Sequence, residues 1–292
     1  MSAARLAVSQ YRVERLASVK AWVAKQQRLL DAAEGAELLL FPEYASLELT
    51  GTLPDAEAGD LAAALAAMQG FGADFVDFYA REAMRRGVTI VAPSIPWPLD
   101  DGRVVNRVWV LRPGRAPAWI DKLTMTRFEA ESWGITAGER NGVFDTPIGR
   151  VGVLICYDSE FPLLARAQVE AGARLLLVPS CTDSEAGYQR VRVGCRARAL
   201  EQQCVVAQSP LTGIAPWSPA IDVNIGRAAV YGPPDRGFPE DGVIAEASDT
   251  ADWLLVDLDL DAVDAVRRDG QVLNHRDWSR QLRPGMAVTE VR

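Results

Sequence analysis

Histidine is nearly absent from this sequence, which has 292 residues and one histidine, His275. A Ser-His-Asp triad or a Cys-His pair would have to use that residue. It lies near the C-terminus, in residues 274–278, with no nucleophile motif beside it. If a cysteine of this chain is a nucleophile, a group other than histidine must activate it, and the composition points to a carboxylate.

The sequence also lacks a Cys-x-x-Cys spacing and a long unbroken apolar run. The first absence argues against a zinc site, and four scattered cysteines fit reduced thiols in a cytosolic protein. Charged residues interrupt positions 1–15, which argues against a signal segment. We therefore expect a cytoplasmic protein with no metal and no membrane partner.

Positive charge is in the minority, with 31 Lys and Arg against 39 Asp and Glu and a formal net charge of −8. Nucleic acids and anionic membranes need a concentrated positive surface, so the balance argues against both as partners. Four arginines do gather at Arg190, Arg192, Arg196 and Arg198. Their spacing puts them on several faces of an expected helix, so we interpret them as solvated or paired charges.

A short apolar run is present at residues 151–155, and it stops abruptly at Cys156. Its composition suits a strand buried on both faces. Pro162 suits the first turn of a following helix, which Asp158 or Ser159 could cap. A cysteine at such a junction has its sulfur at the mouth of a cleft, near helix N–H groups that favour a thiolate. An isolated cysteine there is usually a small buried hydrophobe, so the nucleophile hypothesis depends on the rest of the chain.

Two other charged residues close apolar strands. Glu43 follows residues 37–41, and Lys122 follows residues 118–120. The ordinary alternative for both is a solvent-facing charge. At the carboxyl edge of a sheet, however, a partly desolvated glutamate has a raised pKa and can act as a general base. Asp121 and Lys122 are expected to point to opposite faces of their strand.

Strands and helices alternate, then strands pair, then a second alternating set follows. Strands are expected at 5–8, 37–41, 88–93, 104–111, 118–120, 151–155, 174–181, 204–208, 228–231 and 253–257. Helices are expected at 13–33, 60–86 (broken at Gly70 and Gly72), 163–171, 188–203 and 260–268. The pattern predicts an α/β fold with two sheets and helices outside them, a four-layer α-β-β-α sandwich.

One domain is expected over residues 1–292, because no Pro/Gly/Ser-rich linker divides the chain. The loop at 211–226, rich in Pro, Trp and Gly, is expected to cover or line the cleft. The tail at 271–292 shows no convincing element of its own, and we expect it to pack on another subunit.

Three motifs together resemble the nitrilase superfamily of carbon-nitrogen hydrolases: Phe41-Pro42-Glu43, Lys122-Leu123 and Cys156-Tyr157-Asp158. The resemblance covers residues 5–257. It implies the α-β-β-α sandwich, no metal or organic cofactor, and a homodimer or higher homo-oligomer assembled through the faces of the outer helices.

The resemblance also implies roles for individual residues. Glu43 matches the general base, Lys122 the cation that stabilises the tetrahedral intermediate, and Cys156 the nucleophile. Many members carry a second glutamate soon after the lysine, and Glu129 fits it best, with Glu131 as the alternative. A backbone N–H near Tyr157 would share the oxyanion with the lysine.

The Cys-Tyr-Asp motif is more similar to amidase and carbamoylase branches than to true nitrilases. We therefore expect hydrolysis of a small primary carboxamide to an acid and ammonia through a cysteine thioester. The alternatives are a nitrilase or an N-carbamoyl amide hydrolase with the same triad, and a non-catalytic scaffold. A redox sensor using Cys156 or Cys181 is a further alternative.

Three residues are candidates for contacts with the substrate: Tyr157, Trp133 and Asp183. Asp183 could contact an amino group or another hydrogen-bonding end of the substrate. Capping of the helix that follows is an equally good interpretation of Asp183.

Overall fold

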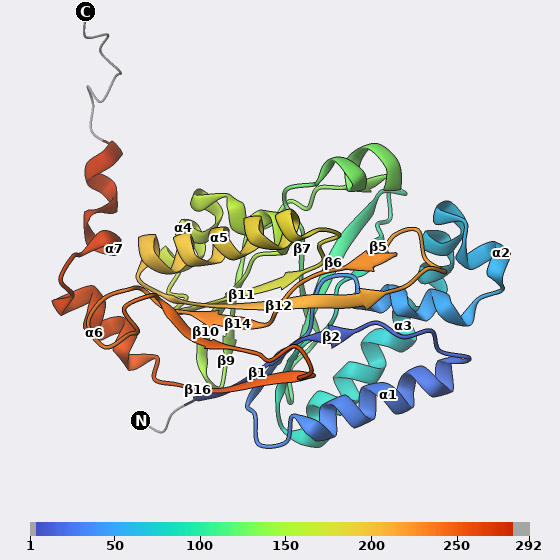
Figure 1. The fold of residues 1–292 in the computed structure, drawn as a ribbon, viewed down its shortest axis with the longest axis horizontal. Helices are drawn as coiled ribbons and strands as arrows, with labels where there is room; N and C mark the ends of the chain where they lie inside the picture. The colour runs from blue at the N-terminus through green and yellow to red at the C-terminus, as the bar shows by residue number, and fades with distance from the viewer. Residues whose placement is uncertain (1–3, 283–292) are drawn as a thin grey trace, which may run out of the picture.

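The computed structural model describes residues 4–282 and consists of two stacked mixed sheets with helices on their outer sides (Figure 1). In Figure 1, helices α4 and α5 cover one side of the stacked strands, and α1 and α3 cover the other. The helices are α1 (Val19–Ala32), α2 (Asp55–Ala58), α3 (Leu61–Arg86), α4 (Pro162–Glu170), α5 (Glu185–Gln202), α6 (Asp261–Asp269) and α7 (Asn274–Asp277). The predicted four-layer sandwich is therefore confirmed.

The first sheet has the order β16-β1-β3-β4-β6-β5, with β7 and β8 also paired to β6. Its strands are β1 (Ala4–Ser9), β3 (Leu38–Leu40), β4 (Thr89–Val91), β5 (Ile95–Pro98), β6 (Val104–Leu111), β7 (Ala118–Asp121), β8 (Ile135–Thr136) and β16 (Trp253–Leu258). Strand β1 lies inside this sheet, parallel to β3 and antiparallel to β16. The first and last described strands are therefore neighbours.

The second sheet has the order β15-β14-β12-β11-β10-β9, with β13 and β2 also paired to β12. Its strands are β2 (Tyr11–Arg12), β9 (Val143–Thr146), β10 (Gly149–Val153), β11 (Leu175–Ser180), β12 (Val205–Ile214), β13 (Val223–Asn224), β14 (Ala229–Tyr231) and β15 (Val243–Glu246). Strands β10, β11 and β12 run parallel, so their carboxyl ends lie at one edge.

Alternating residues of each strand face different layers. Leu38 and Leu40 of β3 belong to the core shared with the second sheet, whereas Leu39 belongs to the core under α1 and α3. This is the two-residue period of a strand buried on both faces, as the apolar run at 37–41 predicts.

Helix α3 differs from the expectation, because it continues without a break through Gly70 and Gly72. A Cβ atom at Gly72 would lie 3.0 Å from the Trp97 ring, so this glycine allows close packing of the helix on β5. By length and composition, α3 could also span a membrane. Here its buried face, which includes Phe75 and Tyr79, packs against the first sheet.

Other boundaries also differ. Helix α1 begins after Ser18, whose side chain accepts a hydrogen bond from Ala21 N, rather than near residue 13. Strand β12 continues to Ile214, into the expected loop at 211–226, because it pairs there with β2 and β13. A 3₁₀ helix, Ala45–Thr52, follows β3 and was not expected.

The tail forms α7 and a 3₁₀ helix, Trp278–Leu282, so the expectation of no element over residues 271–282 is wrong. These residues contact their own chain: His275 N donates to Gln203 Oε1, and Arg166 donates to the carbonyl of His275. Residues 283–292 lie outside the described residues, and packing on another subunit stays a prediction.

Of the arginines on α5, Arg192 pairs with Glu246 and Arg198 pairs with Glu201. This confirms the interpretation of these side chains as paired charges.

Candidate active site

Chain segments from the ends of strands in both sheets meet around one cavity of about 660 Å³. Glu43 follows β3 and Lys122 follows β7 in the first sheet, while Cys156 follows β10 in the second. All three line the cavity. The structure therefore brings together the three residues that the sequence singled out at strand ends.

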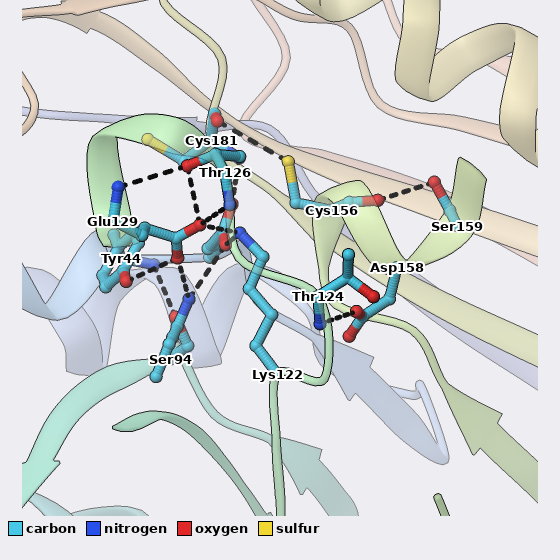
Figure 2. A network of polar contacts seen from close by, with 12 residues as sticks. Tyr44, Ser94, Lys122, Thr124, Thr126, Glu129, Cys156, Asp158, Ser159 and Cys181 are labelled. Carbon is cyan, nitrogen blue, oxygen red and sulfur yellow. Dashed lines mark hydrogen bonds and ion pairs between the residues drawn. The ribbon is translucent and has the colours of Figure 1, made fainter. Parts of the chain in front are cut away.

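Lys122 lies between two carboxylates. Its Nζ is 2.8 Å from Glu43 Oε1 and 2.6 Å from Glu129 Oε2, and all three side chains are at least 97% buried. Figure 2 shows Lys122 pointing toward Glu129. Burial alone would lower the pKa of Lys122, but the two carboxylates outweigh it and raise that pKa well above its usual value. Lys122 is therefore a fixed cation. Asp121 faces the other way, as expected, and pairs with Arg107.

Glu43 accepts hydrogen bonds on both carboxylate oxygens. Oε1 accepts from Lys122 and, at 2.9 Å, from Asn106 Nδ2, and Oε2 accepts from the backbone N–H of Cys181 at 3.0 Å. Burial raises the pKa of Glu43 to about 7, although the charge of Lys122 opposes the shift. Glu43 can therefore exchange a proton close to neutral pH.

Glu129 is held more tightly than Glu43. It accepts from Lys122, from the backbone N–H and hydroxyl of Thr126 at 3.0 and 2.8 Å, and from the Tyr44 hydroxyl at 2.8 Å. Burial acts to raise its pKa, but Lys122 and these donors lower it overall. Glu131 instead pairs with Arg127 on the surface. Glu129, and not Glu131, is therefore the second glutamate beside the lysine.

Cys156 occupies a sharp turn, with a backbone φ of 50°, at the start of the 3₁₀ helix Cys156–Glu160. A non-glycine residue in this left-handed region is uncommon and is often found at functional sites. The Sγ atom lies 3.7 Å from the carbonyl oxygen of Cys181. Burial and the charge of Glu43 raise the pKa of the Cys156 thiol well above its usual value. The expectation that helix N–H groups favour a thiolate is therefore wrong for this arrangement of side chains.

The expected helix caps after Cys156 are also absent. Helix α4 begins directly with Pro162 in its first turn, as predicted, but no side chain caps it. Ser159 Oγ instead donates to the carbonyl of Cys156 at 2.6 Å. Asp158 accepts hydrogen bonds from the backbone of residues 123 and 124, which follow β7 of the other sheet.

The three candidate substrate contacts all line the cavity: Tyr157, Trp133 and Asp183. Helix α5 is capped by Ser184, whose Oγ accepts from Gly187 N, so capping is not the role of Asp183. The segment at 211–226 contributes Pro219 and Ala220 to the lining, as expected for a loop beside the cleft.

Two residues of the site were missed in the sequence. Asn106 is completely buried and donates to both Glu43 and Glu129. Its signal was a polar residue in the middle of the apolar strand β6. Tyr44 directly follows Glu43, and its role is visible only once Glu129 is placed beside it.

His275 lies on α7 rather than in the cavity lining. Burial and the nearby charges of Arg267 and Arg166 lower its pKa to about 4. Within residues 4–282, no group of three or more His, Cys, Asp or Glu side chains is arranged to hold a metal ion.

Comparisons with known proteins bear on this geometry. A probable hydrolase of Bacillus subtilis is 28% identical over 95% of this chain and 54% of its own length. The human deaminated glutathione amidase is 34% identical over 56% of this chain and 44% of its own. The chain thus spans about half the length of these curated relatives.

A solved structure gives the same fold. Saccharomyces cerevisiae Nit3, described as a member of branch 10 of the nitrilase superfamily, aligns with a TM-score of 0.69 and 19% identity, over 91% of this chain and 94% of the other. At this identity the likeness shows the fold alone. The profile of the carbon-nitrogen hydrolase family, however, matches residues 5–268. With that match over nearly the whole described chain, the protein belongs to the carbon-nitrogen hydrolase family.

Proposed function

We propose that this protein is an amidase that hydrolyses a small primary carboxamide to a carboxylic acid and ammonia. The observation that carries the proposal is the buried Glu43–Lys122 pair beside the Cys156 thiol, at the wall of an open cavity. Several relatives are named amidases, among them the human deaminated glutathione amidase.

In the first step, Glu43 accepts the thiol proton of Cys156 as the sulfur attacks the amide carbon. The thiol is neutral at rest because its pKa is raised, so proton transfer has to accompany the attack. Glu43, with a pKa raised to about 7, is a base suited to neutral pH.

The attack places a negative charge on the former carbonyl oxygen of the substrate. Lys122 is the fixed cation next to this position, and one such donor contributes about 3 kcal/mol to the stability of the transition state. Glu129 keeps Lys122 charged and oriented through its 2.6 Å contact. Glu43 then returns the proton to the leaving nitrogen, ammonia departs, and a thioester on Cys156 remains.

Water completes the reaction. Glu43 takes a proton from the water as it attacks the thioester. When the second oxyanion collapses, Glu43 gives that proton to the leaving sulfur, so the carboxylic acid is released and both the thiol and the carboxylate of Glu43 are restored. The cycle needs a base, a cation and a nucleophile, which this cavity supplies without histidine.

The same three groups could act on a nitrile through a thioimidate, or on an N-carbamoyl compound. The amide is preferred because curated relatives carry amidase names. A panel of small amides, carbamoyl compounds and nitriles, assayed for ammonia with wild type and Cys156→Ala, tests the proposal. We expect release from amides that disappears in the variant. Release from nitriles alone would select the nitrilase, and no release from any compound by folded protein would contradict the proposal.

A further inference from the structure

At the active site, two carboxylates each accept hydrogen bonds from the backbone of the opposite sheet's connections, one from each side. Glu43, after β3 of the first sheet, accepts the backbone N–H of Cys181 after β11 of the second. Asp158, after β10 of the second sheet, accepts hydrogen bonds from the backbone N–H groups of Leu123 and Thr124 after β7 of the first, at 3.1 and 2.7 Å. Figure 2 shows the contact with Thr124. The proposed mechanism uses Glu43 and leaves Asp158 without a role.

Burial of the Asp158 carboxylate costs free energy of desolvation. It is 2% exposed, and the hydrogen bonds to its carboxylate come from backbone N–H groups rather than from a neighbouring cation. Burial raises its pKa to about 6, against the effect of these N–H groups and of the charge of Lys122. The cost of burying a carboxylate is offset when hydrogen bonds satisfy its oxygens. Here those hydrogen bonds hold the backbone segment that directly follows Lys122.

We propose that Asp158 is a positioning residue, which holds the segment 122–126 against the turn that carries Cys156 and so sets the place of the Lys122 ammonium group relative to the sulfur. This inference rests on the proposed amide hydrolysis for its kinetic consequence. The held segment ends at Thr126, whose N–H and hydroxyl both donate to Glu129. Asp158 therefore acts on both ends of the Lys122–Glu129 pair through the backbone.

The turn at Cys156 has separate support on its other side. Ser159 Oγ donates to the Cys156 carbonyl, and Arg198 of α5 donates to the Ser159 carbonyl at 3.0 Å. A Cβ atom at Gly194 would lie 3.1 Å from that same carbonyl oxygen, so α5 packs directly on the turn. Loss of the Asp158 carboxylate should therefore displace residues 123–126 more than Cys156.

The test compares Asp158→Ala and Asp158→Asn with wild type. For Asp158→Ala we expect kcat to fall by on the order of 10²-fold, the lower end of the range for a lost oxyanion donor, with KM changed less than about 3-fold. The rate of Cys156 alkylation by iodoacetamide should fall much less than kcat, because the nucleophile and its base stay in place and only the nearby charge of Lys122 moves. Asp158→Asn keeps one acceptor oxygen for Thr124 N and should retain more activity than the alanine variant.

The matched control is Asp145→Ala, which removes an exposed carboxylate from the neighbouring strand β9 and should leave kcat unchanged. Amide hydrogen exchange gives a readout that needs no substrate. In Asp158→Ala the amides of Leu123 and Thr124 should lose protection, while residues 156–160 keep it.

Several results would overturn the inference. An unchanged kcat in folded Asp158→Ala would do so, as would an alkylation rate that falls in parallel with kcat. If the alanine variant does not fold, wild-type kcat in Asp158→Asn together with unchanged exchange at residues 123 and 124 decides against it. If wild type hydrolyses no amide, the proposed function fails by itself, and the exchange experiment still decides whether Asp158 positions this segment.

Discussion

Lys122 Nζ lies 2.6 Å from Glu129 Oε2, and the two side chains are 1% and 3% exposed. Their positions in the chain differ by seven, and the intervening turn brings the carboxylate back onto the ammonium. A buried charge pair of this kind costs desolvation, and removing one partner leaves the other charge uncompensated. The role of Glu129 is therefore to compensate the buried charge of Lys122 rather than to fill space in the core.

Replacing Glu129 by Gln should lower kcat by on the order of 10²-fold, because Lys122 loses one of its two carboxylates and its orientation. The folded protein should also lose about 3 kcal/mol of stability, measured by urea unfolding. Glu131→Gln is the matched control, since Glu131 pairs with Arg127 at the surface. Its kcat should equal that of wild type. Similar losses in both variants would refute the assignment of Glu129.

The activity should follow the ionisation of Glu43. Because burial raises the pKa of Glu43 to about 7, the proton-accepting form is lost below neutrality. The quantity kcat/KM should rise with pH through about 7, with close to a tenfold change per pH unit well below it. A profile that is flat between pH 5.5 and 8 for the best amide would contradict Glu43 as the base.

Alkylation measures the thiol directly. The pKa of Cys156 is raised by burial and by the charge of Glu43, so labelling by iodoacetamide should still accelerate above pH 9. Labelling that has already reached its maximum at pH 7 would indicate a resting thiolate. Peptide mass spectrometry separates Cys156 from Cys181, whose pKa is raised as well. The same raised pKa values predict that mild peroxide modifies neither thiol, which disfavours the redox sensor.

Glu43 should also make stability depend on pH. Its pKa is about 7 in the folded protein and near 4.5 when exposed, so the folded state binds the proton more tightly. The contribution to stability is complete below pH 4.5 and is lost as the pH rises through about 7. Relative to wild type, Glu43→Gln should gain on the order of 1–3 kcal/mol between pH 5 and pH 8. Thermal unfolding at several pH values measures this, and a constant difference between the two proteins would argue against the raised pKa.

Asp183 lines the cavity and does not cap α5. Of the two interpretations of this residue, substrate recognition remains. Asp183→Ala should change the order of kcat/KM values among amides that carry an amino, a neutral or a carboxylate end. Activity toward the simplest neutral amide should change less than about 3-fold, because that substrate has no group that forms a hydrogen bond with Asp183. Asp249→Ala, outside the cavity lining, is the control. An unchanged order of substrates would exclude Asp183 from recognition.

The apolar strand before each of them made Glu43, Lys122 and Cys156 candidates in the sequence, and the resemblance to a known family predicted that they act together. They follow strands of two different sheets, so strand patterns alone did not predict that they meet. It could not identify Asn106, because a polar residue within a strand becomes informative only when its neighbours across the sheet are known. The choice between Glu129 and Glu131 required the π-helical turn Phe128–Trp133, which directs one of them inward.

Errors arose where a distant part of the chain decided the outcome. Gly72 was expected to break a helix, but Trp97 from β5 packs in the space that the glycine leaves. Cys156 was expected to favour a thiolate from its local helix, but burial and the carboxylate of Glu43 decide its pKa. Both effects are tertiary and have no local signature.

The pairing of β1 with β16 has a consequence for protein synthesis. Because β16 is made after every other strand of the two sheets, one hydrogen-bonding edge of β1 stays open until residues 253–258 have been synthesised. The other edge pairs with β3, the strand that leads to Glu43. An open edge can pair with other nascent chains, so premature termination before residue 253 should yield aggregates rather than a weakly active fragment.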